Sequence, residues 1–158
     1  MNLADSWNAL SQGRCAIGPL KNVDRSRVSL KMENGAEVQG FDPTQHFEGG
    51  KEAYLDRFAQ FSVVAARQAI RDSGLDLTPA LRYAGAVICG SAVGGQSAIE
   101  TGFADLYVSD RGRVHPLTIP KTMANAGASH ISMELGITGP TYTVSTACSS
   151  ANHAIGQA

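Results

Sequence analysis

The chain has 158 residues, of which 43% are hydrophobic and 17% are charged, and its formal net charge is −1. This balance is typical of a globular chain that buries a core in one domain, not of a disordered one. A nearly neutral chain without a basic run does not favour nucleic-acid binding. No run approaches the roughly 18 apolar residues of a membrane span, and residues 1–11 lack a signal pattern. We therefore expect a soluble, cytoplasmic protein.

The three cysteines, Cys15, Cys89 and Cys148, are odd in number and far apart. This argues against a disulfide framework and for a reducing compartment. No two of them have Cys-x-x-Cys spacing, so we do not expect a zinc site.

The first fifty residues predict little regular structure. Asp5 or Ser6 can cap a short helix that Gly13 stops. Asn34-Gly35 is a strong hairpin signal, and it predicts a turn between two short strands, Val28–Lys31 and Ala36–Gly40.

Residues 54–73 give the clearest helical pattern, with apolar and small residues at three- and four-residue spacing. Gly74 is a plausible C-terminal cap. Four basic residues surround this helix: Lys51, Arg57, Arg67 and Arg71. They form either a solvated edge or a surface that attracts an acidic partner protein.

The apolar run Ala84–Cys89 predicts a central parallel strand, with Cys89 as an apolar strand residue. A glycine-rich turn, residues 90–95, follows it and leads into a helix that runs through Tyr107. This turn fits neither nucleotide-binding template, because it has no Gly-Lys-Ser/Thr and no Gly-x-Gly-x-x-Gly. We interpret it as a place where backbones approach closely.

After a loop at Ser109–His115, residues 121–135 predict a helix with Pro120 in its first turn and Gly136 at its end. Its small side chains would let another backbone come close, either under an active site or at a subunit contact. Three histidines have no evident catalytic partner in the sequence: His46, His115 and His130. We interpret His46 as a surface residue and His130 as a packing residue.

The last stretch, residues 141–158, predicts a strand over Tyr142–Thr146 and a helix over Ser150–Ala158. Cys148 lies at the joint. The first N–H groups of a helix lack intrahelical partners, favour a thiolate and can hold a developing oxyanion. This is the logic of a nucleophile elbow. The alternative is that Cys148 only packs, as most cysteines do.

His153 follows Cys148 by five residues, which places it roughly 140° around the helix at about 100° per residue. It is therefore poorly placed to be the base for Cys148. The base, if one is needed, lies elsewhere or is replaced by the field of the helix.

Residues 139–156, with Ser-Thr-Ala-Cys-Ser-Ser at their centre, resemble the active-site segment of β-ketoacyl-[acyl-carrier-protein] synthases. These are condensing enzymes of the thiolase superfamily, and the chain looks most like the KAS II branch with its nodulation-type relatives. Four further segments match the family in order: residues 7–18, 56–75, 90–95 and 116–140.

The resemblance implies that Cys148 is the acyl-accepting nucleophile of a decarboxylative condensation in fatty acid elongation. It implies acyl-carrier protein bearing acyl and malonyl groups as the partner, a homodimer for the full-length protein, and no cofactor or metal. The alternatives are a nodulation-type or polyketide ketosynthase, or an inactive truncated or interaction subunit.

The resemblance also implies the fold and its extent. The family begins with a strand that would precede this chain, and it carries two catalytic histidines, a lysine and a glycine-rich gate beyond the cysteine. We therefore expect residues 1–158 to be a partial N-terminal ketosynthase domain. Its fold would be α/β, the N-terminal half of a thiolase-like layered fold, lacking the first strand and with the C-terminal half absent.

Overall fold

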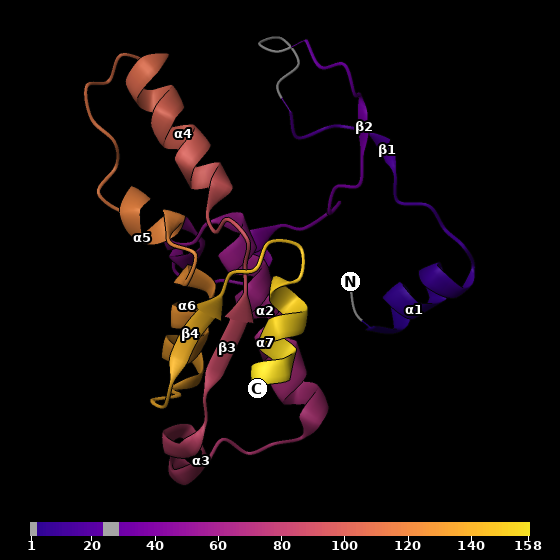
Figure 1. Ribbon diagram of the computed structural model, residues 1–158, viewed down its shortest axis with the longest axis vertical. Helices are drawn as coiled ribbons and strands as arrows, with labels where there is room; N and C mark the ends of the chain where they lie inside the picture. The colour runs from indigo at the N-terminus through magenta and orange to yellow at the C-terminus, as the bar shows by residue number, and fades with distance from the viewer. Residues whose placement is uncertain (1–2, 24–28) are drawn as a thin grey trace. The chain divides into compact units, whose positions relative to one another are not determined.

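The computed structural model describes residues 3–23 and 29–158 (Figure 1). The chain divides into two compact units, Met1–Asp42 and Pro43–Ala158. The candidate site lies in the second unit, which contains all of the buried residues that the structure describes.

The first unit holds one helix and one small sheet. Helix α1 spans Leu3–Ser11, and Gly13 follows it with a φ of 62°. The predicted stop at Gly13 is thus confirmed. The predicted caps are wrong, because Asp5 and Ser6 lie inside the helix.

The hairpin predicted at Asn34-Gly35 is also wrong. These two residues form strand β2, which pairs antiparallel with β1, Gly18–Pro19. The Glu37 carboxylate fastens the same pairing, since it accepts hydrogen bonds from the backbone N–H groups of Lys21 (2.8 Å) and Asn22 (3.0 Å). These bonds, that from Lys21 above all, lower the pKa of Glu37. A non-local pairing has replaced the local turn; Val28, in the first predicted strand, lies outside the described residues.

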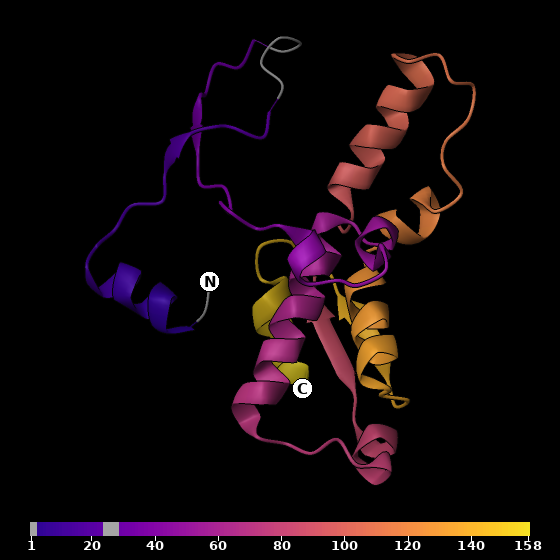
Figure 2. The ribbon, with the colours of Figure 1, turned by 180° about the vertical axis from the view of Figure 1, so that it is seen from behind.

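The second unit is built on a parallel pair of strands, β3 (Val87–Gly90) and β4 (Thr141–Val144). Val87 lies opposite Thr141, and Gly90 lies opposite Val144. Helix α7 (Ser150–Gln157) covers one face of this sheet, while α2 (Arg57–Ser73) and α6 (Ala126–Leu135) lie on the other (Figures 1 and 2). The result is a helix–sheet–helix arrangement, as expected for α/β layering.

The core lies between α2, α6 and the sheet. Its buried apolar residues are Phe47, Leu55, Ala59, Val63, Val87, Ala126, Ala128 and Ile131. The small residues of α6 let the two helices approach closely, because a Cβ on Gly127 would lie 3.0 Å from the Ser62 hydroxyl oxygen. The predicted close approach is confirmed between α6 and α2, while the two settings predicted for it, under an active site or at a subunit contact, stay predictions.

Helix α2 begins three residues later than its pattern predicts. A 3₁₀ helix, η2 (Lys51–Tyr54), precedes it, and the backbone is extended at Leu55 and Asp56. Asp56 is the N-cap, and its carboxylate accepts the Phe58 N–H. The predicted C-cap, Gly74, is confirmed with a φ of 65°.

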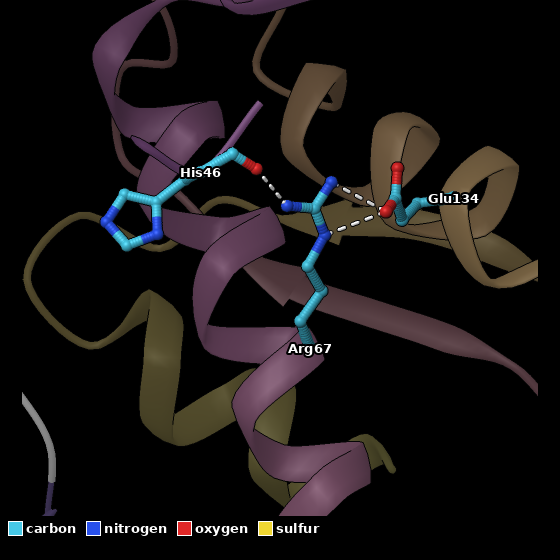
Figure 3. A network of polar contacts seen from close by, with 3 residues as sticks. All are labelled: His46, Arg67 and Glu134. Carbon is cyan, nitrogen blue, oxygen red and sulfur yellow. Dashed lines mark hydrogen bonds and ion pairs between the residues drawn. The ribbon is translucent and has the colours of Figure 1, made fainter. Parts of the chain in front are cut away.

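One arginine ties three segments of this unit together (Figure 3). The Arg67 guanidinium pairs with Glu134 of α6 at 2.6 Å and donates to the backbone carbonyl of His46. It also lies over the Phe47 ring, with its carbon 4.9 Å from the ring centroid. Arg67 thus serves the packing of the chain and does not present an unpaired charge to a carrier protein.

The remaining elements are η1 (Pro43–Gln45), α3 (Pro79–Ala84), α4 (Gln96–Tyr107) and α5 (Thr118–Thr122). The helix through Tyr107 is confirmed. Helix α3, which no pattern predicted, takes up the start of the predicted strand at Ala84. The single helix predicted over residues 121–135 is wrong, because the backbone becomes extended at Met123 between α5 and α6.

Candidate active site

Cys148 lies between β4 and α7, in the five-residue connection 145–149. The predicted position at a strand-to-helix joint is therefore confirmed. Its side chain is exposed and its thiol is free. The sulfur is therefore not covered by the described part of this chain.

The backbone just before Cys148 is in a rare conformation. Ala147 has a φ of 52°, and among the described residues only Asp110 shares a positive φ without being glycine. This left-handed conformation costs an L-residue roughly 1–2 kcal/mol. Such strain persists only where the surroundings over-determine it, and it concentrates at functional sites.

Two serines stabilise this strained conformation through hydrogen bonds. Ser150 is buried, and its hydroxyl accepts the Thr146 N–H at 3.0 Å while it donates to the Ala147 carbonyl at 2.6 Å. The Ser149 hydroxyl donates to the Thr146 carbonyl at 2.8 Å. The small serine neighbours of Cys148 thus close the turn that presents the thiol.

The same turn uses two N–H groups at the start of α7. The N–H of Ser149 donates to the Thr146 carbonyl at 3.2 Å, and the N–H of Ser150 donates to the Ala147 carbonyl at 3.1 Å. The sequence predicted that such groups would face the sulfur. For these two the prediction is wrong, since the tight turn offers them carbonyls of its own.

The glycine-rich turn lies directly beneath this joint. A Cβ on Gly90 would lie 2.5 Å from the Ser150 carbonyl group, so only glycine lets β3 pass so close to the start of α7. The Ser91 N–H donates to the Val144 carbonyl at 3.1 Å, and the Ser145 hydroxyl donates to the Ala92 carbonyl at 3.3 Å. The predicted close backbone approach is confirmed.

None of the four histidines, all of them in the described part of the chain, hydrogen-bonds to the Cys148 thiol. His153 is exposed on α7, and His46 is exposed as predicted. The His115 Nδ1 accepts the Leu117 N–H at 3.2 Å. His130 is half-buried on α6, and burial lowers the pKa of its imidazole. The structure therefore brings no histidine base to Cys148.

The other cysteines differ from Cys148 in their surroundings. Cys89 is half-buried on β3 beside the core, and burial raises the pKa of its thiol. It is an apolar strand residue, as predicted. Cys15 is exposed in the first unit.

Two classes of feature are not seen in residues 3–23 and 29–158. No group of three or more histidine, cysteine or acidic side chains is gathered as a metal site would need. No helix has both the length and the apolar character to cross a bilayer.

Comparison with known families shows the family of this chain. The family model for the N-terminal domain of β-ketoacyl synthases matches residues 1–158. The chain belongs to the β-ketoacyl synthase family. The predicted resemblance is thus confirmed over the whole chain.

Curated relatives are similar over nearly all of the chain. It is 38% identical over 154 residues to nodulation protein E of Rhizobium meliloti, which covers 96% of this chain and 37% of that protein. It is 33% identical over 153 residues to 3-oxoacyl-[acyl-carrier-protein] synthase 2 of Vibrio harveyi, which covers 97% of this chain and 36% of that enzyme. The chain therefore spans little more than a third of the length of these relatives.

Solved structures show the fold. A β-ketoacyl synthase from Burkholderia phymatum matches with a TM-score of 0.78 at 23% identity, over 99% of this chain and 38% of that one. The ishigamide ketosynthase/chain length factor matches with a TM-score of 0.77 at 24% identity, over 92% of this chain and 36% of that one. The chain has the thiolase-like α/β fold of ketosynthases, as predicted.

One residue of the site region was missed in the sequence. Asp56, predicted only as part of the helical segment, sends its second carboxylate oxygen to the N–H of Ala98, 42 residues away. No spacing rule predicts a contact over that separation, although the acidic residue before a long helix does mark Asp56 as an N-cap.

Proposed function

We propose that Cys148 is the acyl-accepting nucleophile of a β-ketoacyl-[acyl-carrier-protein] synthase that acts in fatty acid elongation. The observation that carries this proposal is the joint itself: an exposed, free thiol held on a strained turn between a strand and a helix, in a chain of the ketosynthase family. Because the chain spans a little over a third of its relatives, the proposal concerns the whole protein.

The first half-reaction would be a transthioesterification. The Cys148 thiolate attacks the carbonyl carbon of an acyl group that is thioester-linked to acyl-carrier protein. A tetrahedral oxyanion forms and collapses, and the carrier leaves as its own thiolate. The N–H of Cys148 would donate one hydrogen bond to that oxyanion, and the second donor would come from outside residues 1–158.

The second half-reaction would form the carbon–carbon bond. Malonyl-carrier protein loses carbon dioxide, and the resulting carbanion attacks the acyl carbon on Cys148. The Cys148 thiolate then leaves as the 3-oxoacyl-carrier product forms. Groups that stabilise the enolate would lie outside these residues, because none of the four histidines here hydrogen-bonds to the thiol.

The partner would be acyl-carrier protein. A solved complex of a type II PKS acyl-carrier protein with its ketosynthase resembles this chain with a TM-score of 0.68. Carrier proteins of this kind are acidic, so a basic surface would speed their approach. Lys51 in η2 and Arg71 on α2 are exposed and could contribute, whereas Arg67 is already paired. The full-length protein would act as a homodimer.

Mass spectrometry of the full-length protein tests the nucleophile. After exposure to acyl-carrier protein that bears a saturated acyl chain, the acyl mass is expected on the peptide that contains Cys148. Cys148→Ala should acquire no acyl group, while the matched variant Cys89→Ala should acquire as much as the unaltered protein. Equal acylation of Cys148→Ala would overturn the assignment.

A nodulation-type ketosynthase is the second candidate, because nodulation protein E is among the relatives at 36–38% identity. Both candidates use the same chemistry on different acyl chains. Competition between acyl-carrier proteins with chains of different length and unsaturation separates them. Product formation from malonyl-carrier protein separates either enzyme from an inactive subunit, which would form none.

A further inference from the structure

A buried carboxylate, that of Asp56, joins the starts of two helices in the second unit. Asp56 is 6% exposed. One carboxylate oxygen accepts the N–H of Phe58 at 3.2 Å, at the start of α2. The other accepts the N–H of Ala98 at 2.7 Å, at the start of α4. Each of its oxygens therefore satisfies a backbone donor that its own helix leaves without an acceptor.

Helix α4 depends on this contact, because it has no cap of its own. Its N-cap residue is Gly95, which offers no side-chain oxygen. Serine, threonine, asparagine and aspartate usually supply that oxygen from the N-cap position. Here glycine is required instead, since a Cβ on Gly95 would overlap the Lys121 carbonyl. The cap for α4 is thus supplied from another helix.

The start of α4 is in turn fastened to the joint that carries Cys148. The turn 91–95 connects β3 to α4, and the Val144 carbonyl accepts from Ser91 in that turn. The Ser145 hydroxyl, three residues before the cysteine, donates to the Ala92 carbonyl. A displacement of α4 would therefore move the turn on which the Cys148 connection rests.

We propose that Asp56 is a positioning residue for the reaction at Cys148, because its two oxygens hold α4, and through it the turn 91–95, against the connection 145–149. This inference rests on the proposed function of Cys148. Aspartate suits the role because an ionised carboxylate only accepts hydrogen bonds and has two oxygens for two donors. Serine has one oxygen, and asparagine replaces one acceptor with an N–H₂ donor.

Asp56→Ser separates the role in positioning from ordinary capping. Serine caps helices well, so the bond to Phe58 is kept, but the oxygen that reaches Ala98 is lost. The matched control is Thr78→Ala, which removes the side-chain cap of α3, where the Thr78 hydroxyl accepts from Leu81 at 3.3 Å. Asp56→Asn provides a second variant, which keeps the volume of the side chain but not its second acceptor.

The rate of acyl transfer from acyl-carrier protein to Cys148 is measured on the full-length proteins, together with the thermal midpoint. For Asp56→Ser we expect kcat to fall about tenfold with KM unchanged, because a residue buried within this unit would not contact the carrier. Asp56→Asn should lose at least as much. Thr78→Ala should keep the unaltered rate. Hydrogen exchange at the Ala98 amide should quicken in both Asp56 variants only.

Two outcomes would overturn the inference. One is a rate for Asp56→Ser within twofold of the unaltered protein; the other is an equal loss in Thr78→Ala. If the unaltered protein accepts no acyl group at Cys148, the proposed function fails by itself. The effect of Asp56 on the connection 145–149 can then still be measured from the rate at which iodoacetamide alkylates Cys148. This rate should change severalfold in Asp56→Ser and stay unchanged in Thr78→Ala.

Discussion

The two strands of the parallel sheet enter their helices through connections of equal length and opposite character. The first connection, residues 91–95, joins β3 to α4, and the second, residues 145–149, joins β4 to α7. The first has glycine at its one left-handed position, Gly94, whereas the second has an alanine there, Ala147. Each therefore makes a tight turn, but only one does so at a cost in strain.

The difference follows from what surrounds each connection. Around the first, backbone packs on backbone: a Cβ on Gly94 would lie 2.8 Å from the Thr122 carbonyl oxygen. The second has no such neighbour at Cys148, whose side chain is exposed. The first connection is a packing device, and the second presents a side chain. Glycines allow the close packing of the first connection, and serine hydroxyls stabilise the second by hydrogen bonds.

The largest effect is expected at Gly90, the last residue of β3, which lies against Ser150 at the start of α7. In Gly90→Ala the new Cβ would lie 2.5 Å from the Ser150 backbone. Neither backbone can shift without disturbing the sheet, so the free energy of unfolding should fall by about 3 kcal/mol. Urea unfolding measures it. Gly156→Ala in α7 is the control, because its Cβ would meet open space. Equal behaviour of the two variants would contradict the close approach.

Removal of one serine hydroxyl should loosen the second connection only. Ser150→Ala leaves the Thr146 N–H without its acceptor and the Ala147 carbonyl without one of its donors. Because Ser150 is 4% exposed, water cannot readily replace these bonds. We expect the free energy of unfolding to fall by about 2 kcal/mol. Ser149→Ala, at a more accessible position, should lower the free energy of unfolding clearly less. A larger decrease in Ser149→Ala than in Ser150→Ala would refute the role of Ser150.

Cys148, in the second connection, and Cys89, in the strand before the first, should react at different rates. Cys148 is exposed, whereas burial raises the pKa of the Cys89 thiol above the usual value of about 8.5. Peptide mapping after iodoacetamide treatment at pH 7 should show at least tenfold faster modification of Cys148, which corresponds to about 1.4 kcal/mol. Raising the pH should speed the modification of Cys89, because a larger fraction of its thiol then ionises. Faster modification of Cys89 than of Cys148 at pH 7 would contradict the exposed position of Cys148.

The smallest effect is expected at Ala147, and it has the opposite sign to that at Gly90. Glycine adopts a φ of 52° without penalty, so Ala147→Gly should relieve the strain of the left-handed alanine. The greater freedom of glycine in the unfolded chain offsets part of this gain. We expect a net stabilisation of about 0.5 kcal/mol in urea unfolding. A loss of 1 kcal/mol or more would show that the turn is not strained.

The sequence predicted those parts of the site that depend on local chemistry. Strand composition before Cys148 and small residues after it placed the thiol at a strand-to-helix joint. The glycines at 90–95 predicted close packing, although not with which partner. The pattern at residues 121–135 predicted one helix, but the structure has a break between α5 and α6. The break occurs where the Thr122 carbonyl accepts a hydrogen bond from the Gly95 N–H and the chain turns.

By itself, the amino-acid sequence determined the family, the α/β class and the position of the candidate nucleophile. Each of these is encoded in contiguous residues whose propensities and side-chain chemistry act over a few positions. Tertiary structure alone decided that Asn34-Gly35 pairs with a distant strand, that Asp56 caps a second helix, and that Gly90 lies against Ser150. These contacts join residues far apart in the chain. The conformational preferences of a short segment do not specify which distant donor, acceptor or backbone it will contact.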